Sequence, residues 1–223
     1  MLDRIREKTG VELQVLSGEE EARLTFLAVR RWFGWSAGQL LVLDIGGGSL
    51  ELASGMDEFP DVALSLPLGA GRMTRRFLPD AQSGGRPDLA ALAELDAHAT
   101  TLLKPAVEEL EAAGPPDLVA ATSKTFRTLA RLAGAAPSSA GLRASRKLSA
   151  TGLGQLVEFV SRIESAALAE LPGVSGNRAH QVPAGAVVAA ATLRALDVRF
   201  VRICPWALRE GVILRRLDSL GGV

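Results

Sequence analysis

The sequence has few residues that form cross-links or bind transition metals: one cysteine, Cys204, and two histidines, His98 and His180, among 223 residues. A single cysteine excludes an internal disulfide framework and a cysteine-rich metal cluster. The histidines lie far from each other and from the cysteine along the chain, so we do not expect a histidine-ligated metal. A chain without disulfides is expected in the reducing cytosol.

Net charge is also absent, because 25 lysines and arginines balance 25 aspartates and glutamates. Bulk attraction to nucleic acid or to an anionic membrane is therefore not expected, and any polyanion must bind at a local site. The longest uncharged apolar stretch, residues 181–193, is shorter than the roughly 20 residues that span a bilayer. We interpret this stretch as a buried helix and expect a cytoplasmic protein.

Apolar periodicity predicts a layered α/β fold with a strand meander near its start. The predicted strands are 11–16, 40–45, 50–54, 62–68, 118–121 and 198–203. The predicted helices are 2–8, 18–33 with Ser17 as N-cap, 69–77, 88–113 with a kink or interruption at Pro105, 125–132, 150–171, 183–196 and 205–217.

The segment 44–49, Asp-Ile-Gly-Gly-Gly-Ser, is the strongest local signal for chemistry. Three successive glycines permit positive φ and let backbone amides point at one anion, with the Ser49 hydroxyl as a further donor. Asp44 follows a buried strand and is suited to a hydrated Mg²⁺ ion. The alternative is a tight hairpin capped by the aspartate. We favour phosphate binding, because a two-residue hairpin needs no glycine triplet.

Two further segments offer candidate side chains. Glu21 lies in the first turn of a predicted helix, where a carboxylate could act as a general base or be one charge of a capped, solvated turn. Thr122, Ser123 and Lys124 form a hydroxyl-rich turn between a strand and a helix. That turn could bind phosphate through helix N-terminal amides and the lysine, or simply cap the helix.

Together these segments resemble the Ppx/GppA family of exopolyphosphatases and guanosine pentaphosphatases, and most of all its short actinobacterial exopolyphosphatases. The matching stretches are Ser-Gly-Glu-Glu-Glu-Ala-Arg-Leu at 17–24, Asp-Ile-Gly-Gly-Gly-Ser-Leu-Glu at 44–51, Leu-Pro-Leu-Gly-Ala-Gly-Arg at 66–72 and Ala-Leu-Arg-Glu-Gly-Val-Ile-Leu at 207–214. The similarity runs over nearly the whole chain.

The resemblance implies an actin/hexokinase/Hsp70-like (ribonuclease H-like) fold, a mixed sheet flanked by helices, built as two halves around a cleft. Residues 1–23 would end the first half and form the junction, and residues 24–223 would form the second half. Glu21 would activate water, and Asp44 would serve Mg²⁺ and the attacking water. The amides of Gly46, Gly47, Gly48 and Ser49 would bind phosphate oxygens.

Two departures from the family pattern accompany the resemblance. A complementary first half, with its own phosphate loop, does not precede Met1 in this sequence, so we expect the chain to need that half from a longer protein or another chain. Lys124 stands where many relatives have glycine, which adds a positive charge to the third loop.

The expected activity is release of terminal phosphate from inorganic polyphosphate by metal-assisted attack of water. Guanosine pentaphosphate is the alternative substrate; a non-catalytic phosphate-binding or regulatory module and a kinase are alternative functions. Nucleic acid and membranes are not expected partners, and the possibility of a homodimer stays open.

Overall fold

The computed structural model describes residues 2–12 and 15–221. In chain order its helices and strands are α1 (Leu2–Thr9), α2 (Gly18–Phe33), β1 (Leu40–Ile45), β2 (Leu50–Gly55), β3 (Val62–Leu66), α3 (Ala70–Phe77), α4 (Pro79–Gln82), α5 (Leu89–Ala112), β4 (Leu118–Thr122), α6 (Ser123–Leu132), β5 (Lys147–Ser149), α7 (Ala150–Ser161), α8 (Ser165–Leu168), α9 (Val182–Ala195), β6 (Phe200–Ile203) and α10 (Leu208–Gly221). Within the described ranges, no helix has the length and apolar character needed to cross a membrane.

A six-stranded mixed sheet in the order β3-β2-β1-β4-β6-β5 forms the centre of the molecule. Strands β1, β2 and β3 form the predicted antiparallel meander, while β4 and β6 run parallel to β1. The carboxyl ends of β1, β4 and β6 therefore meet at one edge, which is where ligands bind in open α/β sheets. This mixed sheet with helices on both faces confirms the predicted fold class.

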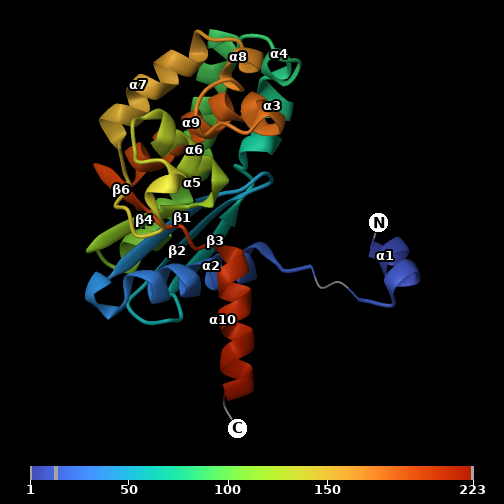
Figure 1. Cartoon of the computed structure of the whole chain (residues 1–223). Helices are drawn as coiled ribbons and strands as arrows, with labels where there is room; N and C mark the ends of the chain where they lie inside the picture. Colours follow the sequence, from blue (N-terminus) through green and yellow to red (C-terminus); the bar gives the residue numbers. More distant parts are fainter. Residues whose placement is uncertain (1, 13–14, 222–223) are drawn as a thin grey trace.

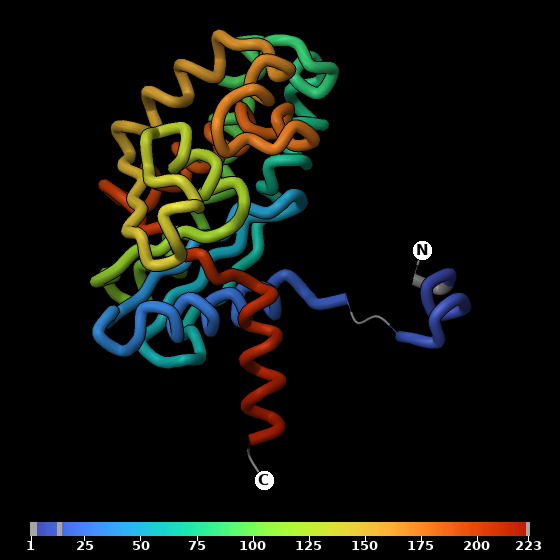
Figure 2. Tube along the Cα trace, in the orientation of Figure 1, coloured from blue at the N-terminus to red at the C-terminus, as the bar shows by residue number. Residues whose placement is uncertain are grey.

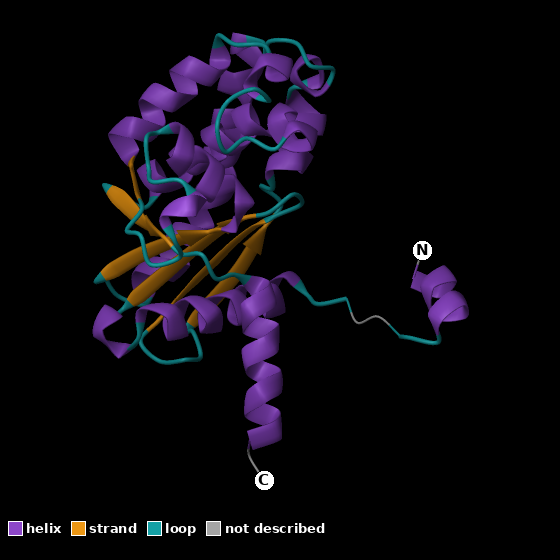
Figure 3. Cartoon of the chain, in the orientation of Figure 1, coloured by secondary structure: helices purple, strands orange, loops and turns teal. Residues whose placement is uncertain are grey.

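Helices cover the two faces of the sheet unequally (Figures 1 and 3). The larger core lies under α3, α5, α6, α7 and α9 and contains Leu41 and Leu43 of β1. The smaller core lies under α2 and contains Leu40 and Val42. Since side chains alternate along a strand, Asp44 shares its face with Leu40 and Val42 and points toward α2.

Helix α10, at the end of the chain, packs against α2, which lies near the start of the chain (Figures 1 and 2). Nearly two hundred residues separate the two helices in the sequence. A Cβ added at Gly211 would overlap the backbone of Leu24, so glycine permits this close contact. The sequence signal for a helix beginning at Pro205 is wrong by three residues. The carboxylate of Glu210 accepts the Ala207 N–H and begins the helix at Leu208.

Two other predicted elements differ from the structure. Residues 11–12 and 15–16 are not in a strand. Residues 13–14 of that prediction lie outside the described residues. The predicted helix 150–171 is two helices, α7 and α8. The break arises because the Ser165 N–H donates to the Gly85 carbonyl rather than continuing the helix.

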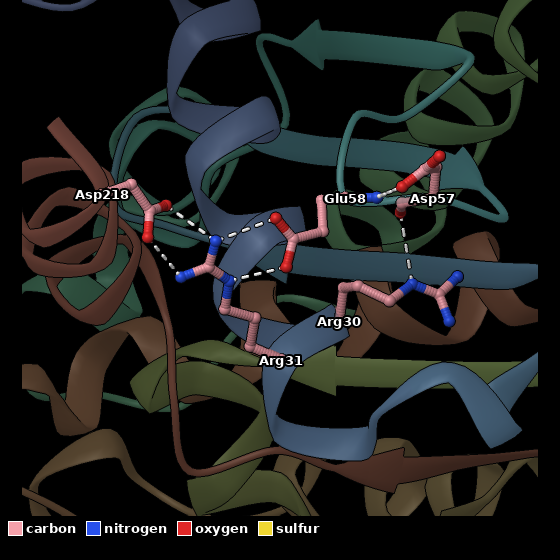
Figure 4. Close-up of polar contacts among 5 residues, drawn as sticks. All are labelled: Arg30, Arg31, Asp57, Glu58 and Asp218. Carbon is pink, nitrogen blue, oxygen red and sulfur yellow. Dashed lines mark hydrogen bonds and ion pairs between the residues drawn. The ribbon is translucent and has the colours of Figure 1, made fainter. Parts of the chain in front are cut away.

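Two adjacent arginines of α2 have different environments (Figure 4). Arg30 is 1% exposed and donates to the carbonyls of Gly34, Gly38, Gly55 and Asp57. Its guanidinium thus joins the end of α2 to two loops from inside the protein.

Arg31, by contrast, lies at the surface and makes bidentate contacts with Glu58 and Asp218, which attach α10 and the β2–β3 loop to α2 (Figure 4).

Replacing Arg30 with methionine is expected to lower the free energy of unfolding by about 3 kcal/mol, because buried carbonyls would lose their donor. The matched variant Arg31→Met removes ion pairs at the surface that are only partly buried and should cost about 1 kcal/mol or less. Urea denaturation of the two variants measures both costs. Equal losses would contradict the interior role of Arg30.

Candidate active site

A row of polar side chains crosses the sheet on the face that α2 covers. In the strand register Ser65 lies opposite Glu51, Glu51 opposite Asp44, and Asp44 opposite Thr122. The row therefore joins β3, β2, β1 and β4 near the edge where β1 and β4 end. Two of its members are carboxylates on neighbouring strands, with no apolar residue between them.

Helix α2 begins directly over this row. Ser17 and Glu20 form the predicted N-terminal cap as a reciprocal capping box, with the Glu20 N–H donating to Ser17 Oγ at 3.2 Å and the Ser17 N–H to Glu20 Oε2 at 2.8 Å. A Cβ at Gly18 would overlap the Ser65 side chain, so the first turn lies against β3. Glu21 lies in the same first turn, half-buried and close enough to raise the pKa of two sheet carboxyls.

Asp44 is the most perturbed carboxyl of the row. Burial raises its pKa to about 7, and repulsion from Glu51 and then Glu21 adds to the rise. The positive charge of Arg127 and a hydrogen bond from Ser123 oppose it. A carboxyl held this far from its ordinary range, beside two like charges, indicates a place built for a cation.

Glu51 is a site residue that our sequence reasoning did not single out. It is 6% exposed, and burial raises its pKa while hydrogen bonds from Ser49 and Ser65 lower it. Ser65 Oγ donates to its carboxylate at 3.0 Å. The Ser49 hydroxyl, predicted as a phosphate donor, is thus directed to a carboxylate of the site instead.

The carbonyl groups of the glycine loop all face helix α3. The Ala70 N–H donates to Gly46 O and the Arg72 N–H to Gly47 O, each at 2.9 Å, and Arg72 Nε donates to Gly48 O at 2.8 Å. In a planar trans peptide the carbonyl and the following N–H point in opposite directions. The N–H groups of residues 47–49 therefore point away from α3.

These three N–H groups have no hydrogen-bond partner among the described residues, whereas the Gly46 N–H donates to Ser49 O at 2.9 Å and is not free. Contrary to the sequence expectation, none of the three glycines in the described loop has positive φ. A Cβ added at Gly47 or Gly48 would meet nothing within 4 Å. Glycine here keeps space open beside unpaired amides, as phosphate binding requires.

Two glycine-to-alanine substitutions should separate loop packing from ligand space. Gly69→Ala would drive a methyl group into the backbone of Gly48 and Ser49, and should lower stability by about 2 kcal/mol or more. Gly48→Ala meets no atom of the protein and should leave stability within about 1 kcal/mol, yet weaken tripolyphosphate binding. Thermal unfolding and calorimetry check the pair; unchanged affinity in Gly48→Ala would show that the open space is not used.

The third predicted loop is only partly a site. Thr122 is wholly buried, and its hydroxyl donates to Trp206 O at 2.7 Å, so its side chain cannot bind phosphate as predicted. Ser123 has φ of +84°, a strained value for a non-glycine residue, and lies beside Asp44. Lys124 is exposed at the start of α6. The strand register places Thr122 opposite Asp44, but the side chain that reaches Asp44 is that of Ser123, the next residue, because the Thr122 hydroxyl is bonded to Trp206 O.

The chain is similar to known proteins over nearly its whole length. The sequence model of the Ppx/GppA phosphatase family matches residues 1–220. Exopolyphosphatase 1 of Mycobacterium tuberculosis (strain H37Rv) is 63% identical over 220 residues, which cover 98% of this chain and 62% of the relative. Exopolyphosphatase 1 of Mycobacterium leprae is 61% identical, covering 98% of this chain and 63% of the relative. The chain thus spans less than two thirds of the length of these curated relatives.

Solved structures show the same fold at lower identity. An exopolyphosphatase from Cytophaga hutchinsonii superposes with a TM-score of 0.83 at 21% identity, covering 98% of this chain and 69% of that one. The Aquifex aeolicus PPX-GPPA enzyme gives 0.76 at 23% identity, covering 96% and 69%. On its sequence match over nearly its full length, the chain belongs to the Ppx/GppA phosphatase family.

Proposed function

We propose that this chain carries the water-activating half of an exopolyphosphatase, which releases terminal phosphate from inorganic polyphosphate. The observation that carries the proposal is the glycine loop, whose carbonyls accept hydrogen bonds from α3. Its N–H groups at residues 47–49 have no partner in the described part of the chain and lie beside a row of carboxylates. The mycobacterial relatives named exopolyphosphatase 1, at 61–63% identity, support the choice of substrate.

The carboxylates fit a divalent cation, and we propose Mg²⁺. Burial and repulsion from neighbouring carboxylates raise the pKa values of Asp44 and Glu51, and a cation held by these two side chains would remove that penalty. Among the described residues no three His, Cys, Asp or Glu side chains converge to form a metal site unaided. This suits Mg²⁺, which keeps several waters and uses one or two carboxylates plus substrate phosphates. When bound, the ion would neutralise charge on the terminal phosphoryl group.

Each protein group has a separate task in the proposed reaction. The N–H groups of Gly47, Gly48 and Ser49 bind oxygens of the terminal phosphate and stabilise charge that develops there. Glu21, on the helix above Asp44, orients water and accepts its proton during in-line attack. Lys124 adds a positive charge at the same edge of the sheet.

The proposal retains the two-part organisation predicted from the sequence. Residues 24–223 form the second half of the fold, and residues 1–23 lead into it. Helix α2 crosses that division as one continuous helix on the sheet, so Glu21 is positioned by the second half.

The test is phosphate release from polyphosphate without any organic acceptor, in the presence of Mg²⁺. It is run on this chain and on the chain joined to the part of the M. tuberculosis relative that it does not match. Turnover by the joined protein, faster on polyphosphate than on guanosine pentaphosphate, supports the proposal. Binding without turnover would make the chain a phosphate-binding module, faster turnover of guanosine pentaphosphate would reverse the substrate assignment, and a requirement for an acceptor would indicate a kinase.

A further inference from the structure

A cavity of about 710 Å³ opens beside the candidate active site, between α6 and the loops on either side of it. Its lining includes four cationic side chains, Lys124, Arg127, Arg131 and Arg146. We call this cavity the α6 groove. The groove begins at the active site itself. Lys124 and Arg127 lie in the first turns of α6, which starts at Ser123, and the charge of Arg127 acts on Asp44.

No carboxylate in the described ranges forms a salt bridge with the four cations of the groove. Arg146 donates to the carbonyls of Ala136, Pro137, Gly141 and Ala144, and so folds the loop that forms one wall. Carbonyl oxygens satisfy the N–H groups of a guanidinium without cancelling its charge.

The two arginines of α6 follow the same pattern. Arg131 donates to Ala135 O and Arg127 to Ser123 O. Within the described part of the chain, neither of them nor Arg146 or Lys124 forms an ion pair.

We propose that the α6 groove holds the phosphates that follow the terminal one, so that the enzyme prefers an inorganic polyphosphate chain to a guanine nucleotide. This inference rests on the proposed function. Of the described residues that line the groove, none is acidic and none is aromatic. A guanine base is commonly stacked on an aromatic ring and needs acceptors for its N–H donors, and the wall carbonyls named above already accept from Arg146. A polyphosphate needs only repeated positive charge.

The test measures affinity against chain length by calorimetry. Tripolyphosphate, which reaches mainly the glycine loop, is compared with a fractionated polyphosphate several times longer, using wild type and the double variant Arg127→Gln/Arg131→Gln. For wild type the longer chain should bind more tightly. The double variant should lose about tenfold for the longer chain, about threefold per exposed guanidinium, and much less for tripolyphosphate. The control is the double variant Arg75→Gln/Arg162→Gln, which changes the net charge by the same amount at positions outside the groove lining. Its affinity for both phosphate chains should equal that of wild type.

The outcomes separate this inference from the proposed function. If tripolyphosphate binds and is hydrolysed but longer chains gain no affinity, or both double variants lose affinity equally, the groove assignment is overturned and the proposed function stands. If tripolyphosphate neither binds nor is hydrolysed by the joined protein, the proposed function itself fails. Equally tight, groove-dependent binding of single-stranded poly(U) or of guanosine pentaphosphate would also overturn the preference for polyphosphate.

Discussion

Replacing Glu21 with glutamine is expected to slow phosphate release by the joined protein about 10²–10⁴-fold, the usual contribution of a general base. Glutamine keeps the size of the side chain but cannot accept the proton of the attacking water. Affinity for tripolyphosphate should stay the same or rise, because a negative charge near the phosphate is removed. The measurement is kcat with saturating substrate, together with calorimetric affinity.

The matched control is Glu19→Gln, which removes one charge from the same helical turn at an exposed position. It should retain nearly full activity. Rates for Glu21→Gln within about threefold of wild type, far below the contribution of a base, would exclude Glu21 as the base. An equal loss in both variants would indicate a general electrostatic effect of the acidic turn instead.

Asp44→Asn is expected to abolish activity and yet to stabilise the metal-free protein at pH 8. The folded-state pKa of Asp44 is raised from 3.8 to about 7, so the folded protein binds the proton more tightly than the unfolded chain does. Wild type therefore loses stability as the pH rises from about 4 to about 7. Asparagine escapes this loss, which is worth on the order of 1.4 kcal/mol per pKa unit, giving a gain of about 4 kcal/mol at pH 8.

Thermal or urea unfolding at pH 4 and pH 8 measures this difference. The gain of Asp44→Asn should fall below about 1 kcal/mol near pH 4, close to the unfolded-state pKa of 3.8, because the folded protein keeps its proton there and little ionisation of the unfolded chain remains. Asp80→Asn, an exposed control on α4, should show no such pH dependence. Added Mg²⁺ should stabilise wild type at pH 8 but not Asp44→Asn. If Asp44→Asn is as unstable as wild type at pH 8, burial and repulsion do not destabilise the Asp44 carboxylate. If Mg²⁺ stabilises wild type and Asp44→Asn equally, the ion binds elsewhere.

Strand periodicity and turn chemistry accounted for most of the architecture. The apolar run 40–45, the glycine turn and the next two strands were sufficient to predict the meander, and the Ser17 cap fixed the start of α2. Glu51 could also have been found. A four-residue turn that pairs Ile45 with Leu50 places the next pair, Asp44 and Glu51, side by side.

What the sequence could not supply depends on tertiary contacts. The glycine triplet leaves open space beside the loop, and its carbonyls accept hydrogen bonds from α3. It does not use the positive φ that the residue type suggested. Likewise Thr122 carries a hydroxyl at the end of a strand, and only the return of the chain at Trp206 shows that this hydroxyl is already bonded. The α6 groove combines residues from distant segments, so no local motif marks it.

The central claim is that the N–H groups of Gly47, Gly48 and Ser49 bind phosphate beside Asp44. Amide NMR spectra of the ¹⁵N-labelled chain, recorded while tripolyphosphate is added with Mg²⁺, test it without requiring turnover. The account predicts that these three amides shift downfield and saturate together, while the Gly46 amide, already bonded to Ser49 O, moves much less. Binding that leaves all three amide signals unchanged would contradict the account.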